Sequence, residues 1–158
     1  MRLVILGGSG SGKSTQAQRL CKHFEISLIS TGEILREAMS GNKPQSAYAT
    51  LTDLGRYVQP YLEKGELVPD DMMIELIRTR FKKPDINSGW VLEGYPRTAF
   101  QAEELDFLLD DLGQKLDRAI YLQVPEAVMV SRSLGRCLPD DQPEIVHRRV
   151  ELFYDRTI

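Results

Sequence analysis

Short apolar runs alternate along the chain with longer stretches whose apolar residues have helical spacing. Four of these runs are apolar at most positions and are bounded by glycine, proline or polar residues, which is typical of strands buried on both faces of a parallel sheet. They are Leu3–Leu6, Ser27–Ile29, Trp90–Leu92 and Ala119–Val124. The pattern therefore predicts four parallel strands.

Helical spacing fills the segments between these strands. Helices are predicted over residues 13–24, 31–39, 47–63 with an interruption near Pro60, 69–81, 98–109, 125–135 and from 142 to the end. Alternating strands and helices predict an α/β fold, in which helices cover both faces of the sheet and ligands bind at the carboxyl ends of the strands. We expect one domain, 1–158. Residues 30–68 carry little strand signal, so they are expected to form an inserted helical subdomain.

The composition narrows the classes of partner and compartment. A net charge of −3 gives no general electrostatic footprint for nucleic acid, so phosphates must be held by locally placed cations. The two cysteines, Cys21 and Cys137, match no metal-ligand spacing and are expected to be free thiols in a reducing compartment. The N-terminal apolar run is too short for a signal peptide or a membrane span. We expect a cytoplasmic monomer with no nucleic-acid or membrane partner.

A glycine-rich segment follows the first predicted strand. Residues 7–15, here called the phosphate loop, read Gly-Gly-Ser-Gly-Ser-Gly-Lys-Ser-Thr and fit the pattern G-x-x-x-x-G-K-[ST] between a strand and a helix. Glycines let backbone N–H groups surround phosphate oxygens, Lys13 supplies a positive charge, and Ser14 offers a hydroxyl to Mg²⁺. The loop predicts binding of a nucleoside triphosphate. It leaves the reaction open, since small-molecule kinases, GTPases and other ATPases share it.

Motifs beyond the phosphate loop indicate a reaction. In order, they are Ser30–Glu33 with Arg36, Lys64–Asp70, Glu93–Thr98 with Gln101, Gly135-Arg136, and Asp140-Asp141 with Arg149. Together with the phosphate loop they resemble the adenylate kinase family of nucleoside-monophosphate kinases, short-lid type, over nearly the whole chain. The resemblance implies a P-loop fold that transfers the γ-phosphoryl group of Mg-ATP to AMP, giving two ADP. It also implies an acceptor-nucleotide-binding subdomain at 30–68 and a minimal lid at 136–142.

The resemblance assigns roles to individual residues. Two polyanions must be held in line away from water, which requires cations from several elements, and guanidinium groups match phosphate oxygens well. The implied catalytic residues are Lys13, Arg97, Arg132, Asp140, Asp141 and Arg149. The implied ATP-binding residues are Gly10, Ser11, Gly12, Lys13, Ser14, Thr15 and Arg136. The implied AMP-binding residues are Thr31, Arg36, Glu66, Leu67, Val68, Gly94, Arg97, Gln101 and Arg149.

Acceptor specificity and metal binding are also implied by the resemblance. Thr31 and Gln101 resemble the positions that read the acceptor base. The uridylate/cytidylate branch is expected to have alanine in place of Thr31, so adenine is favoured. Glu33 and Glu93 are implied to hold Mg²⁺ through water, and Ser14 to bind it directly. The family usually has aspartate at the two carboxylate positions and glycine at the serine, which predicts a rearranged metal shell.

Three departures from the family pattern affect these expectations. Leu138 stands where short-lid relatives have an arginine between the two nucleotides, so the site is expected to be one cation short. Residues 44–51 look like an insertion, which predicts a differently shaped acceptor subdomain. The sequence stops at Ile158, where the family continues with a fifth strand and a closing helix. Either the sequence is a shortened chain, or the protein functions with four strands and a more open site for the donor base.

Two other functions fit parts of the sequence. The leucine at 138 and the missing C-terminal elements also fit an adenylate-kinase-like nucleotide-binding regulatory protein with weak or no catalysis. The phosphate loop by itself fits another small-molecule P-loop kinase, such as a sugar-acid kinase. The motifs Ser30–Glu33 and Gly94–Arg97 argue against that kinase.

Overall fold

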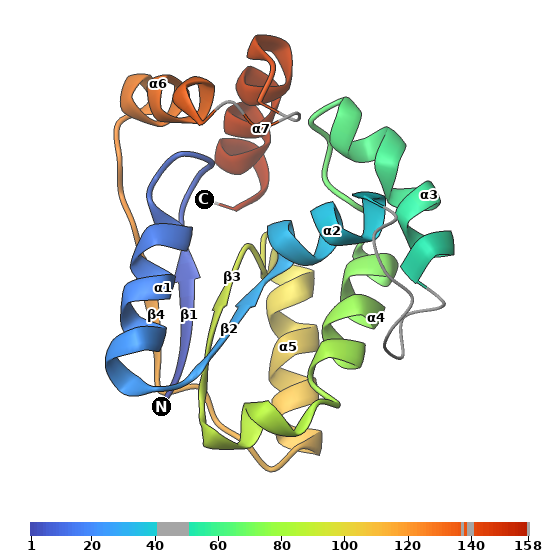
Figure 1. The fold of residues 1–158 in the computed structure, drawn as a ribbon, viewed down its shortest axis with the longest axis vertical. Helices are drawn as coiled ribbons and strands as arrows, with labels where there is room; N and C mark the ends of the chain where they lie inside the picture. The colour runs from blue at the N-terminus through green and yellow to red at the C-terminus, as the bar shows by residue number, and fades with distance from the viewer. Residues whose placement is uncertain (41–50, 137, 139–140, 158) are drawn as a thin grey trace.

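The fold alternates strands and helices along the chain (Figure 1). The computed structural model describes residues 1–40, 51–136, 138 and 141–157. In chain order its elements are β1 (Arg2–Leu6), α1 (Lys13–Phe24), β2 (Ser27–Ser30), α2 (Thr31–Ser40), α3 (Leu51–Glu63), α4 (Asp70–Arg80), the 3-10 helix η1 (Pro84–Ser88), β3 (Trp90–Glu93), α5 (Ala99–Asp111), β4 (Arg118–Tyr121), α6 (Glu126–Gly135) and α7 (Pro143–Arg156). The predicted α/β class is confirmed.

The strands form a parallel sheet in the order β2-β3-β1-β4. On one side of β1 lie β3 and, beyond it, β2; on the other side lies β4. Ligands of open α/β sheets bind where the strand order reverses in this way, at the carboxyl ends of the strands. The register pairs Ile5 with Glu93, so the phosphate loop after β1 and Gly94 after β3 emerge at the same edge.

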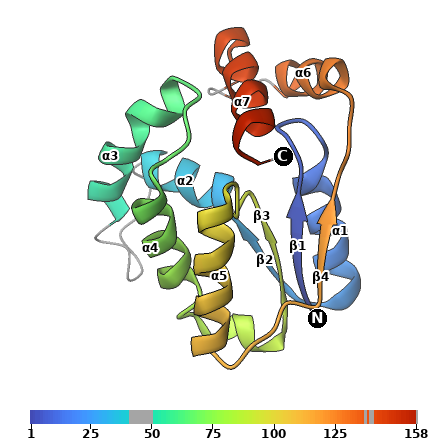
Figure 2. The same ribbon diagram turned by 180° about the vertical axis from the view of Figure 1, so that it is seen from behind.

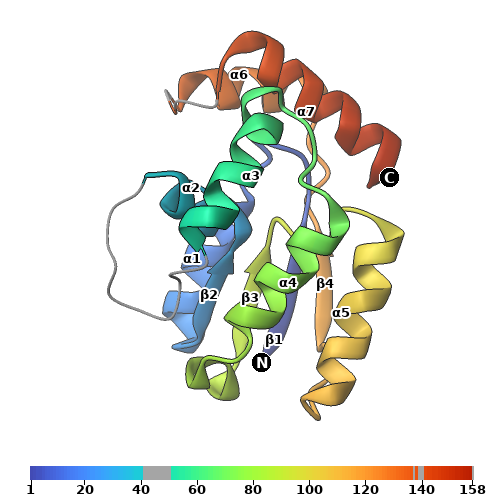
Figure 3. The same ribbon diagram turned by 90° about the vertical axis from the view of Figure 1, so that its right-hand side faces the viewer.

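Each face of the sheet is covered by different helices. Leu3, Ile5 and Val91 lie in one hydrophobic cluster with Ala17 of α1. The opposite face packs against α4 and α5, which Figures 2 and 3 show on the far side of the sheet from α1. This second cluster contains Val4, Ile29, Met73, Leu76, Ile77, Phe81, Trp90, Leu92, Leu105 and Leu109, among others. Burial on both faces explains why the inner strands are apolar without alternation.

Two expectations about individual elements are corrected. The strand predicted at 119–124 is Arg118–Tyr121, the edge strand paired only with β1, and most of its side chains are exposed because none of them belongs to the two hydrophobic clusters between the sheet and its helices. The interruption predicted near Pro60 is not present, since α3 continues through Pro60 to Glu63. Pro60 lies in the last turn, where its missing N–H removes one hydrogen bond near the helix end.

The helices α6 and α7 lie together beyond the carboxyl ends of the strands, next to the phosphate loop (Figures 1 and 2). They bring the predicted lid residues toward β1. No helix in the described ranges is long and apolar enough to cross a membrane. The predicted insertion at 44–51 lies almost entirely outside the described residues, as do Cys137 and Asp140.

Candidate active site

The phosphate loop is held against α6, and this contact requires glycine. Gly10 has φ +79°, and a Cβ there would collide with the carbonyl oxygen of Met129. Gly12 precedes α1 with φ +97° and provides no side-chain cap, so the first N–H groups of α1 are left to bind an anion. The hydroxyl of Ser11 is buried without a hydrogen-bond partner among the described residues. The loop therefore has the unpaired polar groups that a bound phosphate would satisfy.

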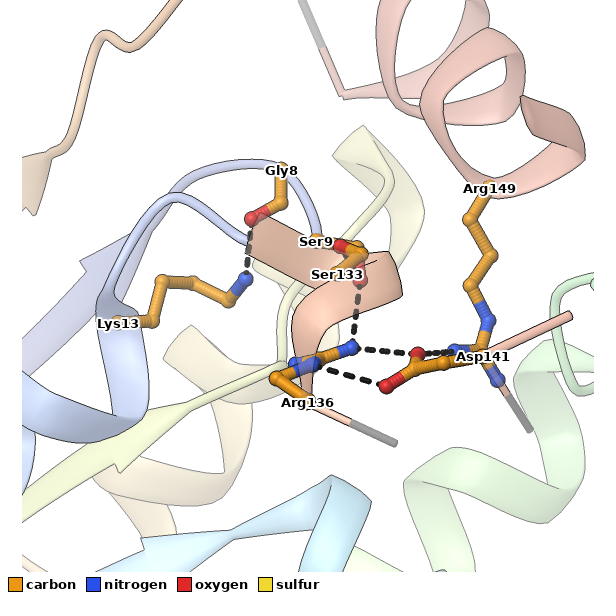
Figure 4. Close-up of polar contacts among 7 residues, drawn as sticks. All are labelled: Gly8, Ser9, Lys13, Ser133, Arg136, Asp141 and Arg149. Carbon is orange, nitrogen blue, oxygen red and sulfur yellow. Dashed lines mark hydrogen bonds and ion pairs between the residues drawn. The ribbon is translucent and has the colours of Figure 1, made fainter. Parts of the chain in front are cut away.

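Lys13 is the loop's cationic side chain. Its Nζ donates a hydrogen bond of 2.8 Å to the carbonyl oxygen of Gly8 (Figure 4). Desolvation, together with the nearby cations Arg97, Arg136 and Arg149, lowers the pKa of Lys13 to about 8, and Glu93 opposes the shift. Positive charge is therefore concentrated around this ammonium group, and a polyanion would relieve the repulsion.

Glu93 ends β3 and is buried, and two serine hydroxyls donate to the same oxygen of its carboxylate. Ser14 Oγ donates to Glu93 Oε1 at 3.2 Å, and Ser30 Oγ donates to that oxygen as well. Ser30 also accepts from the backbone N–H of Glu33 at 3.4 Å. Among the described residues, no cluster of three or more His, Cys, Asp and Glu could hold a metal unaided.

This oxygen-rich set fits Mg²⁺ delivered with a nucleotide. Mg²⁺ favours oxygen ligands, retains several waters, and is usually bound through one or two carboxylates together with substrate phosphates. Ser14 and Glu93 supply a hydroxyl and a carboxylate beside the phosphate loop. Glu33 is exposed in the first turn of α2, where it is accessible to a water ligand.

Two arginines and one buried aspartate connect the end of α6 and helix α7 to the phosphate loop (Figure 4). Arg136 donates to both oxygens of Asp141, with Nε–Oδ2 at 3.0 Å and Nη2–Oδ1 at 2.7 Å. Arg149 Nη1 lies 3.5 Å from Asp141 Oδ1, whose side chain is only 1% exposed. Arg136 Nη2 also donates to Ser9 Oγ at 3.2 Å, and Ser133 donates to Ser9 at 3.3 Å. The aspartate thus fixes both guanidinium groups beside the loop.

Residues predicted to bind the donor nucleotide and residues predicted to bind the acceptor nucleotide line the same cavity. We call it the central cavity. Its lining includes Ser9, Lys13, Ser14, Thr31, Arg36, Glu66, Leu67, Val68, Glu93, Gly94, Arg97, Gln101, Arg136 and Arg149. These residues come from both halves of the chain, and their proximity is a consequence of the strand order.

The part of the central cavity lined by the predicted acceptor residues Thr31, Arg97 and Gln101 is closely packed around Gly94. Gly94 has φ +85°, and a Cβ there would collide with Thr31 Oγ1, which itself donates to the carbonyl oxygen of Glu93 at 3.4 Å. Arg97 Nε donates to the carbonyl oxygen of Gly94 at 3.0 Å. Gln101 is 2% exposed, and its backbone N–H donates to the capping hydroxyl of Thr98 at 3.2 Å. These short connections hold Thr31, Arg97 and Gln101 in a fixed arrangement.

Glu66 reaches beyond the central cavity to α7. Its carboxylate accepts from Arg148 twice, with Nε–Oε1 at 2.9 Å and Nη2–Oε2 at 3.2 Å. Arg148 also donates to Glu151 at 2.8 Å. The implied AMP-binding role of Glu66 stays a prediction, and its side chain links the segment after α3 to α7.

Several residues implied by the sequence are not part of the lining of the central cavity. Arg132 is exposed on α6, and Thr15 and Glu33 are exposed on α1 and α2. Leu138 is half-buried, and its carbonyl oxygen accepts from the backbone N–H of Asp141 at 3.0 Å. The roles of Arg132 and Thr15 stay predictions.

Sequence reasoning missed three serines and one aspartate near the central cavity. Ser9, Ser30 and Ser133 orient the groups described above, and Asp70 accepts from Gln101 Nε2 at 2.8 Å. Ser9, Ser30 and Asp70 stand within the motifs, so their positions were visible in the sequence. Their partners were not visible, because each contact joins elements that are distant in sequence.

Known proteins resemble this chain over its length. A family model described as adenylate kinase matches residues 5–158. Adenylate kinase 2 of Nostoc sp. (strain PCC 7120) is 78% identical over 158 residues, covering 100% of this chain and 81% of the relative. Adenylate kinase 2 of Synechocystis sp. (strain PCC 6803) is 54% identical over 158 residues, covering 100% of this chain and 82% of the relative. An adenylate kinase of Caldicellulosiruptor bescii is 44% identical over 136 residues, covering 86% of this chain and 59% of the relative.

Proposed function

The chain belongs to the adenylate kinase family of nucleoside-monophosphate kinases, and we propose that the central cavity holds ATP and AMP together for phosphoryl transfer. The reaction moves the γ-phosphoryl group of ATP to AMP and gives two ADP. The observation that carries the assignment of the cavity is its lining, because Lys13 and Ser14 of the phosphate loop face the same space as Arg36, Arg97 and Gln101.

The donor triphosphate is proposed to lie on the phosphate loop. The N–H groups at the start of α1 and the unpartnered hydroxyl of Ser11 supply neutral donors. Lys13 supplies the charge and has a depressed pKa, which a bound polyanion would raise again. Arg136 donates a hydrogen bond to Ser9 and so adds a guanidinium group next to the phosphate loop.

The acceptor is proposed to lie across the central cavity from the phosphate loop. Arg36 and Arg97 supply cations for its phosphate, and both line the cavity. Thr31 and Gln101 are buried next to the same space and offer polar atoms to a base. Leu67 and Val68 provide apolar surface for the ring.

The transfer step joins these two nucleotides. An oxygen of the AMP phosphate attacks the γ-phosphorus, and the bond from that phosphorus to the β–γ bridging oxygen breaks, leaving ADP with the electron pair. A nucleoside monophosphate is already largely dianionic at neutral pH, so no general base is needed. Catalysis then depends on alignment and charge neutralisation. Arg97, Arg136 and Arg149 are proposed to provide that charge.

Mg²⁺ would be held by Ser14 and Glu93, with Glu33 acting through water, because these oxygen donors suit a hard cation. The ion supplies charge neutralisation on the donor phosphates. Ser30 keeps one oxygen of Glu93 occupied and so restricts how that carboxylate is presented.

An acceptor panel tests this function. The purified protein is incubated with Mg-ATP and each of AMP, GMP, CMP and UMP, and ADP formation is followed by chromatography. We expect ADP formation to be fastest with AMP. Turnover of a pyrimidine nucleotide in preference to AMP, or no turnover of any acceptor by folded protein, would refute the assignment. A regulatory protein without catalysis and a sugar-acid kinase are not favoured, given the close similarity to adenylate kinases.

We further propose that the protein works as a monomer in the cytoplasm. Analytical ultracentrifugation with and without nucleotide measures the oligomeric state.

A further inference from the structure

The side-chain amide of Gln101 is engaged at both of its polar atoms. Its Oε1 accepts the backbone N–H of Arg97 at 2.7 Å, and its Nε2 donates to Asp70 Oδ1 at 2.8 Å. The two partners come from different elements, since Asp70 begins α4 and Arg97 lies in the loop between β3 and α5. Gln101 is 2% exposed, so its amide is shielded from bulk water, and each of the two hydrogen bonds is partly buried.

These partners determine which way the amide faces. A backbone N–H can only donate, so the atom facing Arg97 must be the oxygen. An ionised carboxylate can only accept, so the atom facing Asp70 must be the nitrogen. A rotation of the amide by half a turn would place donor against donor at Arg97 and acceptor against acceptor at Asp70. The orientation is therefore fixed by chemistry from two independent directions.

One donor and one acceptor of the amide are left after these two bonds. Nε2 keeps its second N–H, and Oε1 keeps its second lone pair. Gln101 lines the central cavity, whereas Asp70 lies behind it, outside that lining as the described residues define it. An amide in this state offers a base a fixed order of acceptor and donor.

That order distinguishes purines that have almost the same shape. Adenine presents the amino group N6 as a donor next to N1 as an acceptor, and a carboxamide pairs with such an edge through both of its atoms. Hypoxanthine presents O6 as an acceptor next to N1–H as a donor, which is the reverse order. A locked amide suits adenine only, whereas an amide free to rotate would suit both bases.

We propose that Asp70 is a specificity-determining positioning residue, which makes the acceptor site select adenine by locking the amide of Gln101. The inference rests on the proposed role of Gln101 as the reader of the acceptor base. Asp70 itself touches no nucleotide. Its effect is on discrimination between acceptors, which a purely structural residue in the first turn of α4 would not change.

The test compares AMP with IMP as acceptors. In Asp70→Asn the side chain keeps its shape but can accept or donate, so it tolerates both orientations of the amide. We expect the ratio of kcat/KM for AMP to that for IMP to fall about tenfold, the effect of weakening one charge-assisted hydrogen bond. The KM for ATP should not change. An unchanged AMP/IMP ratio in folded Asp70→Asn would overturn the inference.

Two further variants separate specificity from stability. Asp71→Asn removes the same charge from the same helix turn at an exposed position, and its AMP/IMP ratio should equal that of the unmodified protein. Asp70→Glu keeps an acceptor-only group and should retain most of the preference for AMP. A loss of preference in Asp71→Asn equal to that in Asp70→Asn would instead indicate a helix-terminus effect and overturn the inference. Should Asp70→Asn not fold, the ratio in Asp70→Ala replaces it.

Gln101→Leu distinguishes failure of this inference from failure of the underlying assignment. If Gln101→Leu keeps the preference for AMP, Gln101 does not read the base, and both statements fall. If Gln101→Leu loses the preference while Asp70→Asn keeps it, only the role of Asp70 falls. Equilibrium binding of AMP and IMP by calorimetry gives the same comparison without turnover.

Discussion

At the scale of single residues, the central cavity is a place where positive charge is concentrated and then oriented. Lys13, Arg136 and Arg149 lie around the phosphate loop, and one buried carboxylate, Asp141, holds the two arginines. Repulsion between these closely spaced positive charges destabilises the empty site and favours the binding of a polyanion. Two predictions follow from the physical state of particular side chains.

The first prediction concerns the pH dependence of ATP binding. The free protein holds Lys13 with a pKa of about 8, below its ordinary value of 10.5, mainly because of desolvation. A bound triphosphate raises that pKa, so binding takes up a proton above about pH 8, and affinity falls by up to about tenfold per pH unit there. Calorimetry in two buffers with different ionisation enthalpies measures the proton uptake.

Without nucleotide, the same pKa shift has the opposite sign for stability. The unfolded chain binds more protons than the folded one between pH 8 and 10.5, so Lys13 makes the free energy of unfolding rise with pH across that range.

The matched control for nucleotide binding is Lys13→Arg. Its guanidinium stays charged throughout this pH range, so ATP binding to this variant should take up no proton. An affinity for ATP that is equal at pH 7 and about pH 9.5 would contradict the role of Lys13.

The second prediction concerns Asp141. Asp141→Asn keeps the shape of the side chain but removes the charge that holds Arg136 and Arg149. We expect kcat to fall on the order of 100-fold, as when one preorganised transition-state group is lost, with a smaller change in the KM values. Steady-state kinetics with AMP and Mg-ATP measure this.

The control for Asp141→Asn is Asp85→Asn, which breaks another two-bond arginine pair, with Arg80, before the amino end of β3. That change should leave kcat unaltered. A normal kcat in folded Asp141→Asn, with the melting temperature checked for both variants, would show that the two arginines need no carboxylate partner.

At the scale of elements, the sequence predicts well what local pattern controls. Helix α1 has the predicted bounds, Lys13 to Phe24, because the glycines of the phosphate loop set its start and Glu25, at φ +53°, takes the left-handed conformation that ends it. Gly94 and Thr98 likewise mark the end of β3 and the cap of α5. The apolar character of β4 predicted burial, which is wrong because the two hydrophobic clusters between sheet and helices include β1 and β3 but no residue of β4.

Contacts between distant elements could not be predicted from the sequence. The pairing of Asp70 with Gln101 spans 31 residues, and the pairing of Glu66 with Arg148 spans 82 residues. No periodicity reports such contacts, because they depend on how α4, α5 and α7 pack around the sheet. The candidate site residues were therefore visible as motifs, whereas the groups that orient them were visible only in the fold.

A third prediction tests the packing of α7 against Gly65, in the segment after α3. Gly65 has φ +70°, and a Cβ there would lie 2.7 Å from the carbonyl oxygen of Ile145 in α7. We expect Gly65→Ala to lower the free energy of unfolding by about 2–4 kcal/mol, from backbone strain plus overpacking. Urea denaturation followed by circular dichroism measures the change.

Gly113→Ala is the control for Gly65→Ala. Gly113 has a similar φ of +65°, but a Cβ there would meet nothing within 4 Å, so this variant reports backbone strain alone. The difference between the two variants measures the contact with α7. Equal losses of stability would mean that α7 does not press on Gly65 in solution.

At the scale of the whole molecule, the order of the strands creates the site. Because β1 and β3 are neighbours, the phosphate loop and the segment after Glu93 emerge at one edge, and α6 and α7 lie beyond that edge (Figure 1). Glu66 and Arg148 then connect the segment after α3 to α7. The two nucleotides are therefore expected to be enclosed by parts of the chain that are themselves linked.

The central claim is that the protein, with both nucleotides bound in the central cavity, transfers one phosphoryl group directly from ATP to AMP. The most direct measurement follows the label from [γ-³²P]ATP incubated with AMP, Mg²⁺ and the protein. The account predicts that the label appears in the β-phosphate of ADP, with two ADP formed for each AMP consumed. Release of the label as inorganic phosphate while AMP is unchanged would contradict it.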